Sequence, residues 1–584
     1  MLSPGLVATL GAKMKGRKVL PWFGTVILFG LLLSVASLPV EGADKPAAYP
    51  KPPEGANVPI MPDAWKTAPR TKATSQEIDA LLNKSLEADK VKPSPLTSDE
   101  QFIRRATLDL TGRLPLPADV TEFLADRSPD KRARLIDRLL DSEEFCSHWG
   151  RYWHDVILSR ATDDRIKRLG ITRAFELWMA EQLKARRSWN QIARDMITVE
   201  GALKYGPENA DTSNGAAVFL LCHQGQEAAV ERAAETSRVF LGIQIQCAQC
   251  HDHPNDIWKR EQFHQLTAFY ARLTERPIRM PGGNRIEGIQ LISKPNGEHQ
   301  MPNLADPKKS TTIMPKHLTG EPYSGGRSDS DRRKALADWV TAEDNYWFAA
   351  AFANRIWGEL MGQAFYQPVD AMGPLQQATY PDVLLRLAAS FRASGYDIRE
   401  FYRLIANTEA YQRQIRLGDS ADEHLQFAGV YPSRLNGDAL WESLQGVLGP
   451  MQAGSRPQVT GPAARFLNRN SVERQFKDLF DFDPSTKPDE VEGSIPQALM
   501  LMNNPSINNQ MRATGNTVLA KLLRAYPQDD EAIRMLYLRT LARKPTTAEF
   551  DTCKSYIAEV GNRNEAFEDL LWTLINSTEF QTKR

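Results

Sequence analysis

Two cysteines and a histidine form the clearest chemical signal in this sequence. Cys247 and Cys250 are three positions apart, and His251 follows the second cysteine directly. The spacing is typical of c-type haem attachment, because two thiols add to the two vinyl groups of one porphyrin and the adjacent imidazole reaches its iron. Only five cysteines occur in 584 residues, so chance seldom produces this pattern. The sequence predicts haem c as cofactor, with Cys247 and Cys250 as anchors and His251 as proximal ligand.

The second ring nitrogen of a proximal imidazole needs a partner, which fixes the orientation and basicity of the ring. We expect Asp252 or a backbone carbonyl in that role. The sequence does not specify the sixth iron ligand. A methionine there favours electron transfer, whereas an open position favours small-ligand or peroxide chemistry. The candidates by residue type are His223, His264, Met280, Met301, Met314 and His317.

Two other chemistries use the same residues. Cys247, Cys250, His251 and His253 are thiolate and imidazole ligands that suit zinc or iron without a porphyrin. Adjacent Cys250 and His251 are cramped around one tetrahedral ion, and the usual second ligand pair is missing. A redox-active or structural disulfide between Cys247 and Cys250 is the third interpretation, which an exported compartment permits.

Two amphipathic helices are expected to position the motif. One spans residues 227–242 and leads into Cys247, and the other spans residues 260–272. The second carries apolar side chains on one side, and we expect the apolar faces of both helices to form the walls of a haem crevice. The alternative is that these aromatic residues fill the core.

A helical segment recurs in the chain. Residues 99–115 resemble residues 530–545, and each is followed by a helix end of similar sequence, at 139–145 and 574–580; a partial third copy occupies 404–411. In each copy Asp or Asn with Ser or Thr closes one helix and caps a following turn. We interpret the repeat as a helical hairpin that packs a core.

Three further groups of residues have two interpretations each. His148 and His154 either border a pocket or lie on an amphipathic helix face, and Cys222-His223 either approaches the haem or pairs a buried thiol with a surface imidazole. Arg355, beside Asn354, either binds an anionic or sugar-like ligand or bonds carboxylates between helices.

Composition narrows the class of protein. The chain has 72 basic and 72 acidic residues, which argues against a nucleic-acid partner. Basic residues precede an apolar run at 19–36, so residues 1–43 are predicted to be a signal peptide or N-terminal anchor. This indicates export to the periplasm or cell envelope, with attachment to the membrane if the segment is not cleaved. Motifs of serine hydrolases, zinc proteases and nucleotide-binding enzymes are absent from the sequence.

The predicted fold is mostly α, a multi-helix two-domain architecture with a loop-rich connector and a small β element. Residues 44–74 are rich in Pro and Ala and are predicted to be a linker. Residues 75–275 form a helical domain that contains the cysteine motif. A connector with a strand at 286–292 spans 276–329, and a helical C-terminal domain spans 330–584.

Short segments spread over most of residues 75–580 resemble a known domain pair. They are 102–105, 112–115, 139–145, 240–254, 332–339, 354–357, 370–373, 394–398, 434–440 and 496–499. The first half resembles the planctomycete cytochrome-like domain of unknown function, and the second resembles the planctomycete-specific C-terminal domain usually fused to it. Residues 491–494 depart from the pattern, because the family tends to have Cys and Arg before Pro496-Gln497-Ala498-Leu499. The resemblance implies an exported protein from a family without a settled activity.

Taken together, the sequence predicts an exported c-type haem protein that acts in extracytoplasmic electron transfer or oxidation with a redox partner protein. The alternative is a non-haem binding or scaffolding protein of the cell envelope, with polysaccharide as one candidate target. In that case the cysteine pair binds zinc or iron or forms a disulfide.

Overall fold

The predicted fold class is confirmed: in the computed structural model the chain is mostly helical, with three small antiparallel sheets among the described residues. The predicted signal or anchor segment, 1–43, lies outside the described residues, as does the linker up to residue 60. The structure describes residues 61–162, 172–204, 212–283, 286–306, 308–416, 427–451 and 472–583.

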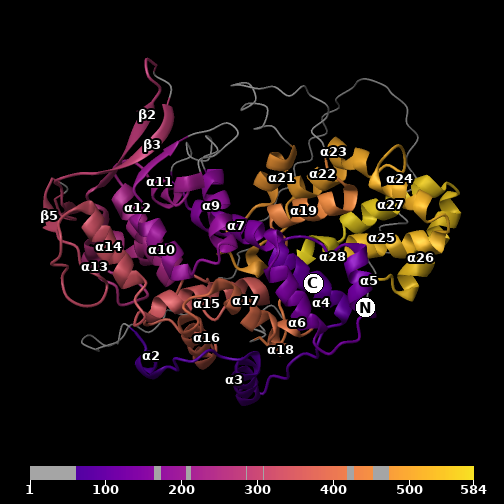
Figure 1. The fold of residues 1–584 in the computed structure, drawn as a ribbon, viewed down its shortest axis with the longest axis horizontal. Coiled ribbons are helices and arrows are strands. Elements are labelled where there is room, and N and C mark those ends of the chain that lie inside the picture. Colours follow the sequence, from indigo (N-terminus) through magenta and orange to yellow (C-terminus); the bar gives the residue numbers. More distant parts are fainter. Residues whose placement is uncertain are drawn as a thin grey trace, which may run out of the picture. The chain divides into compact units, whose positions relative to one another are not determined.

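The elements of the first half are mainly helices (Figure 1). They are α2 (Ala64–Thr67), α3 (Ser75–Ala88), α4 (Asp99–Thr111), α5 (Pro117–Ala125), α6 (Lys131–Leu140), α7 (Glu143–Leu158), α9 (Thr172–Lys184), α10 (Trp189–Thr198), β1 (Gly201–Lys204), η1 (Thr212–Asn214), α11 (Ala217–Leu221), α12 (Ala228–Leu241), η2 (Ile245–Gln249), α13 (Arg260–Thr267), η3 (Ala268–Tyr270), β2 (Leu273–Arg279), β3 (Ile286–Ser293), β4 (His299–Pro302) and β5 (Ser310–Ile313), where η marks a 3₁₀ helix.

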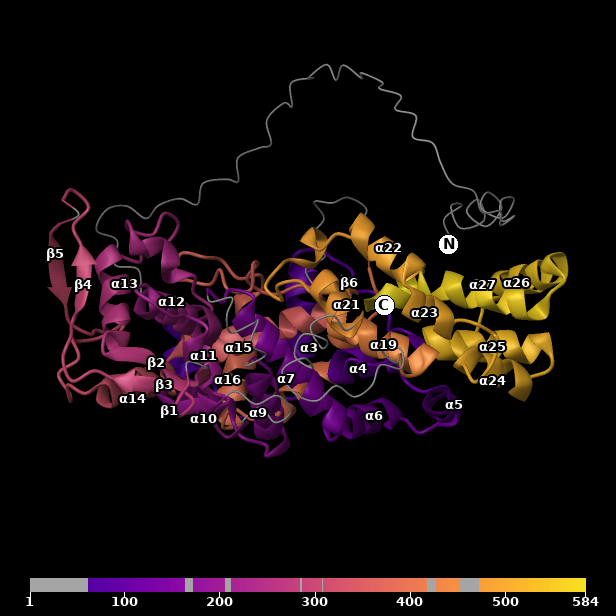
Figure 2. The same cartoon turned by 90° about the horizontal axis from the view of Figure 1, so that it is seen from above.

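Helices also dominate the second half, and α24–α27 lie together in both views, apart from β2–β5 (Figures 1 and 2). The elements are α14 (Asp329–Val340), α15 (Tyr346–Met361), α16 (Pro381–Ala393), α17 (Ile398–Ala406), α18 (Glu409–Gln412), β6 (Ser433–Arg434), α19 (Gly437–Leu448), α21 (Val472–Phe480), η4 (Pro488–Glu490), α22 (Ile495–Asn503), α23 (Pro505–Gln510), α24 (Val518–Ala525), α25 (Asp529–Leu541), α26 (Thr547–Val560), α27 (Arg563–Ile575), α28 (Thr578–Gln581) and β7 (Thr582–Lys583).

The sheets are small and lie partly in the predicted connector. The strand predicted at 286–292 is present as β3, the centre of a three-stranded antiparallel sheet in the order β1-β3-β2. The pairs β4–β5 and β6–β7 complete the strand content of the described residues.

Two apolar cores organise the described chain. The larger extends from Trp65 to Val430 with Leu538 and Ala542, and the smaller combines Leu108 with residues from Leu435 to Phe580. The cores therefore separate near residue 430, whereas the predicted domain boundary is the connector at 276–329. The first core includes α15–α17, because α15 packs on both α12 and α16.

Part of the predicted linker is folded. Residues Ala64–Thr67 form α2, and the Trp65 side chain is buried against Tyr346, with ring centroids 5.5 Å apart. The Arg392 guanidinium lies 3.8 Å from the centroid of the Trp65 ring. Arg392 and Arg386 also donate to the carbonyls of Ala68 and Thr71. These contacts involve residues far away in sequence, so hydrophobic periodicity gave no signal for the segment.

The caps predicted for the helical repeat are present. The side-chain oxygens of Ser142, Thr408 and Ser577 accept hydrogen bonds from backbone N–H groups three residues later, at the starts of α7, α18 and α28. Each cap satisfies one of the N–H groups that a helix leaves without an internal partner. Local sequence therefore determined these three helix starts.

The repeats also contact one another. Buried Arg104 of α4 donates to the carbonyl of Glu579 at 2.6 Å, and Arg105 donates to the carbonyls of Tyr411 and Arg413 at 2.7 and 2.8 Å. One repeat thus binds backbone oxygens at the ends of the other two. This agrees with the interpretation of the repeat as a packing unit.

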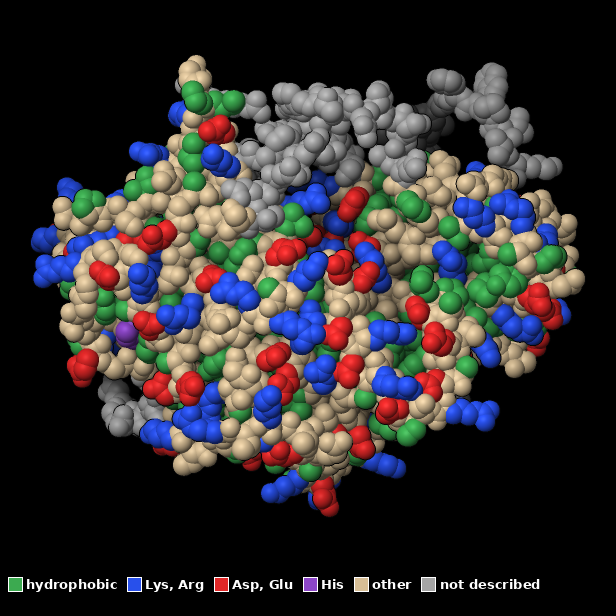
Figure 3. Space-filling view, viewed as in Figure 1, with side chains coloured by type: hydrophobic (Ala, Val, Ile, Leu, Met, Phe, Trp, Pro, Cys, Tyr) green, Lys and Arg blue, Asp and Glu red, His purple; other side chains and the backbone are tan. Residues whose placement is uncertain are grey.

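The visible surface carries mixed charge. Lys, Arg, Asp and Glu side chains are interspersed over the face in Figure 3. Within the described ranges, every helix is too short or too polar to span a lipid bilayer.

We expect Gly112→Ala to destabilise the protein by about 2–4 kcal/mol, because a left-handed backbone disfavours alanine and the added methyl group has no room. Gly112 ends α4 with φ of 66°, and its Cβ would lie against the His148 ring. Gly561→Ala is the matched control, since Gly561 has the same φ but no atom within 4 Å of the added group. The Gly561→Ala substitution should lower the free energy of unfolding by about 1–2 kcal/mol. Urea unfolding measures both, and equal losses would contradict the steric argument.

Candidate functional site

The cysteine motif begins in a short 3₁₀ turn, η2, shortly after α12, and Cys250 and His251 directly follow this turn. The helix ends at Gly242 in the left-handed conformation, with φ of 69°. Residues three apart eclipse one another in a 3₁₀ helix. Ile245 and Ala248 are fully buried, whereas Cys247 and Cys250 are exposed free thiols. Burial of the first pair therefore directs both thiols outward.

The His251 ring is oriented by a backbone carbonyl, as one of the two predicted alternatives. Its Nδ1 lies 2.7 Å from the carbonyl oxygen of Asp252. A carbonyl can only accept, so Nδ1 carries the proton and Nε2 keeps a lone pair. The imidazole is exposed, and Nε2 has no hydrogen-bond partner among the described residues.

The Asp252 carboxylate has a separate task. It accepts from the backbone N–H of Arg260 at 3.0 Å and from Lys259 Nζ at 2.9 Å, and these bonds lower the pKa of Asp252. The carboxylate thus ties the motif to the start of α13.

His253 faces inward and is already engaged. Its Nδ1 accepts from the Asn255 N–H at 3.2 Å, and its other nitrogen bonds the Gln244 carbonyl. Burial lowers the pKa of His253. Among the described residues, no three His, Cys, Asp or Glu side chains are grouped closely enough to hold a metal ion. The structure therefore does not assemble Cys247, Cys250, His251 and His253 around one point.

The expected crevice walls are filled. Phe240 of α12, Phe263 of α13 and Phe269 of η3 are buried in the larger core. Phe240 packs against Trp189 and Phe219, and Phe269 against His317, so among the described residues these rings fill the core rather than line an open slot. The two thiols and the imidazole fit covalent attachment of a porphyrin and ligation of its iron, but α12 and α13 do not supply an enclosing pocket.

The candidate sixth ligands differ in availability. His264 Nε2 donates to the Gln249 carbonyl at 3.0 Å, and its Nδ1 lies 2.7 Å from Nε2 of His299, so both nitrogens are occupied. His223 is buried, and its Nδ1 lies 3.2 Å from the Thr162 hydroxyl. Met280 and Met314 are exposed.

A cavity of about 300 Å³ reaches Cys247. Its described lining contains charged and amide side chains, whose aliphatic stems also contribute, together with Ala234 and Cys247. The lining residues are Arg160, Ala234, Glu235, Arg238, Gln244, Gln246 and Cys247.

Behind this cavity lies a buried ionic network centred on Asp370. The Asp370 side chain is 0% exposed, and its Oδ2 lies 3.2 Å from Arg238, 3.6 Å from Arg355 and 3.8 Å from Arg160. Gln244 Nε2 donates to its Oδ1 at 3.3 Å. Burial alone would raise the pKa of Asp370, but the three guanidinium groups lower it. Arg355 therefore bonds a carboxylate between elements, the second of its two predicted roles.

The network joins segments that lie far apart in sequence. Ile243 and Ala371 form an antiparallel bridge, and the Met372 N–H donates to the Gly242 carbonyl at 2.9 Å. Segment 370–373 thus pairs with the end of α12 immediately before the cysteine motif.

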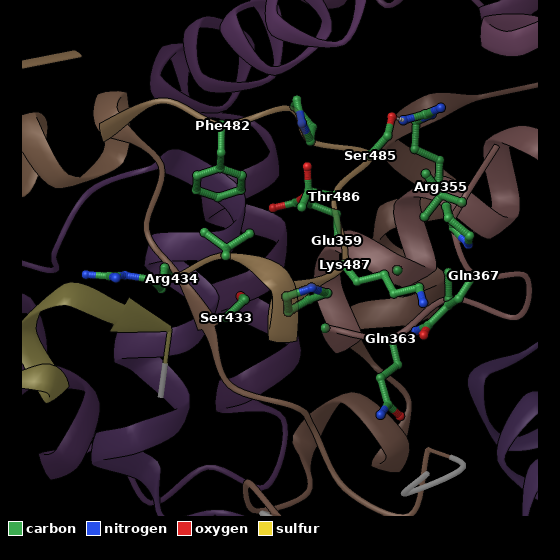
Figure 4. A pocket seen from close by; sticks show the side chains of 18 residues that line it. Arg355, Glu359, Gln363, Gln367, Ser433, Arg434, Phe482, Ser485, Thr486 and Lys487 are labelled. Carbon is green, nitrogen blue, oxygen red and sulfur yellow. Dashed lines mark hydrogen bonds between the residues drawn. The ribbon is translucent and has the colours of Figure 1, made fainter. Parts of the chain in front are cut away.

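A second cavity lies on the other side of Arg355 (Figure 4). Arg355 donates to the Ser485 hydroxyl at 3.3 Å at one end, and Arg434 lies at the opposite end. Between them the figure shows Phe482, Thr486 and Lys487.

A group of ionisable residues that sequence patterns did not predict lies between α7, α19 and α21. The His154 Nδ1 is 2.8 Å from Asp155, and Lys477 Nζ is 2.5 Å from Asp438. Surrounding protein atoms, with the carboxylates of Asp155 and Asp438, raise the pKa of Asp481 to about 8. Sequence analysis had named His154 as a candidate pocket residue, and Asp438 falls within the matching segment 434–440.

The other predicted histidine, His148, is buried against the end of α4. Burial lowers its pKa well below the usual value. It is a core residue, unlike the ion-paired His154.

This mostly helical chain matches two families of domains of unknown function, one after the other in the sequence. Residues 77–275 match the PSCyt2 family, described as Protein of unknown function (DUF1549). Residues 332–557 match the PSD1 family, described as Protein of unknown function (DUF1553). No curated protein and no solved structure matches the chain.

We expect Asp370→Asn to lower the free energy of unfolding at pH 7 by about 3–5 kcal/mol, because removing one member of a buried ionic network leaves the others uncompensated. Folding lowers the pKa of Asp370. Its contribution to the free energy of unfolding is therefore complete above the pKa of the unfolded chain, near 4, and is lost as pH falls through the pKa of the folded protein.

Glu343→Gln is the matched control, because Glu343 pairs with Arg70 at the surface with both side chains more than two-thirds exposed. Urea unfolding should show almost no effect of this substitution. If both variants lose equally little, the Asp370 network is not a stabilising element.

Proposed function

We propose that this chain is an exported protein that carries one haem c on Cys247 and Cys250, with His251 as the proximal iron ligand. It takes part in extracytoplasmic electron transfer or oxidation with a redox partner protein. The supporting observation is the hydrogen bond from His251 Nδ1 to the Asp252 carbonyl, 2.7 Å long, which leaves the Nε2 lone pair for a metal. When bound, the haem supplies one-electron chemistry at its iron.

The protein's own residues would do three things. The exposed thiols of Cys247 and Cys250 are accessible for attachment on one side of η2. The Asp252 carbonyl holds the imidazole in one tautomer, and the Asp252 carboxylate fixes the loop to Lys259 and the Arg260 N–H. A cofactor held by exposed residues exchanges electrons with a partner without a long protein barrier.

Export is part of the proposal and rests on sequence. Basic residues before the apolar run at 19–36 are typical of a signal or an anchor. c-type haem is attached outside the cytoplasm in bacteria, so the two predictions support each other.

The proposal is tested by producing the full chain in a bacterial host that exports it and has c-type maturation. We expect a haem-peroxidase band at the mass of the chain in a denaturing gel, because thioether bonds survive denaturation. The pyridine haemochrome spectrum should give one haem per chain. The Cys247→Ser/Cys250→Ser double variant should lose the band.

Cys553→Ser is the control, because Cys553 is buried against Tyr537 in the smaller core and should not affect attachment. A folded, colourless parent protein from this host would refute haem attachment. Stoichiometric zinc or iron in that preparation would favour the non-haem metal site, and a metal-free preparation would favour the scaffolding alternative.

A further inference from the structure

Arg160 presents unused hydrogen-bond donors to the cavity beside Cys247. It follows the end of α7, and 34% of its side chain is exposed. Its Nε lies 3.6 Å from Asp483, and one terminal nitrogen lies 3.8 Å from Asp370. Both distances exceed the range of a hydrogen bond. The carboxylates of Asp370 and Asp483 therefore attract the guanidinium, but it donates no hydrogen bond to any described residue.

The neighbouring arginine is used differently. Arg238 makes three hydrogen bonds with Glu235, at 2.6, 2.9 and 3.1 Å, and donates to the Val156 carbonyl. The carboxylates of Glu235 and Asp370 neutralise the charge of Arg238 within the protein. Of the two arginines that line the cavity, Arg160 is thus the one available to a ligand.

Two glutamines supply acceptors on the same wall. Gln244 Nε2 donates to Asp370 at 3.3 Å, and Gln246 Nε2 donates to Glu231 at 3.1 Å. A carboxylate only accepts, so these contacts orient each amide with its NH₂ group on the carboxylate. The amide oxygens remain as acceptors. The cavity therefore combines a guanidinium donor with carbonyl acceptors.

We propose that this cavity binds a small organic carboxylate that also carries hydroxyl groups. Arg160 binds the carboxylate, for which its planar fork of N–H donors is suited, and the Gln244 and Gln246 oxygens accept from the hydroxyls. The formal charges of Arg160, Arg238 and Arg355 balance those of Glu235, Asp370 and Asp483, so directed hydrogen bonds rather than net charge set the preference. A volume of about 300 Å³ suits a small molecule.

The site does not depend on haem. Cys247 is the only motif residue that lines the cavity among those described, and its thiol serves as a reporter. Cys250 is also exposed but is not among the described lining residues, so it is an internal control.

The test uses the full chain produced without c-type maturation, so that both thiols stay free. Iodoacetamide labelling of Cys247 and Cys250 is followed by peptide mass spectrometry with gluconate, acetate or uncharged sorbitol present. At ten times its half-protecting concentration, gluconate should slow labelling of Cys247 about tenfold. Labelling of Cys250 should not change, acetate should protect less, and sorbitol should not protect.

Arg160→Gln should abolish the protection, and Arg113→Gln should retain it because Arg113 pairs with Glu144 and Glu442 elsewhere. Circular dichroism checks folding. If Arg160→Gln does not fold, Gln246→Glu gives the same test, since a negative charge on this exposed side chain repels a carboxylate.

Three results would overturn the proposal: no protection by gluconate, equal protection of Cys250, or undiminished protection in a folded cavity variant. None of these results bears on haem attachment, which is measured in a different host by a different signal. The two proposals therefore fail independently.

Discussion

The Asp370 carboxylate has no exposed surface and lies among the guanidinium groups of Arg238, Arg355 and Arg160. A buried carboxylate loses its hydration, and only close opposite charge compensates that loss. The compensating groups come from α12, from α15 and from the residue that follows the end of α7. This arrangement fixes the end of α12 against segment 370–373. The turn η2 begins four residues after α12 ends and contains Cys247, and Cys250 directly follows it. The position of the motif therefore depends on charges supplied by both matched regions.

The cysteine motif exposes two thiols and an imidazole on a loop that is packed against the core. Ile245 and Ala248 are buried beneath the loop, and the exposed Asp252 carboxylate bonds the start of α13, while the two thiols and the imidazole are exposed. Aromatic residues of α12 and α13 stabilise the core and do not enclose a cofactor. In a haem protein of this design, attachment depends on covalent bonds and the iron ligand rather than on burial in an apolar pocket. Solvent exposure of the group is then one of the factors that set its potential.

The helical repeat shows how short local signals support a large fold. Each copy carries a Ser or Thr cap that starts the next short helix, and Arg104 and Arg105 bind carbonyl oxygens at the ends of the other copies. Capping is a contact over three residues, whereas the arginine contacts span more than three hundred positions. The same sequence unit therefore serves both local structure and long-range packing.

Sequence by itself determined the elements and chemistry that depend on neighbours in the chain. Helix caps, the strand β3 and the spacing of Cys247, Cys250 and His251 all involve residues close together in the chain, whereas the choice of the Asp252 carbonyl rather than its carboxylate as partner of His251 came from the structure. Tertiary structure decided the rest. Residues far away in sequence decided three alternatives that the local pattern left open. They decided whether Phe263 lines a crevice or fills the core, whether Arg355 bonds a ligand or Asp370, and whether Trp65 anchors the predicted linker. Arg238 and Asp370 are 132 positions apart, and periodicity carries no information about such a pairing because it records only the face of one element.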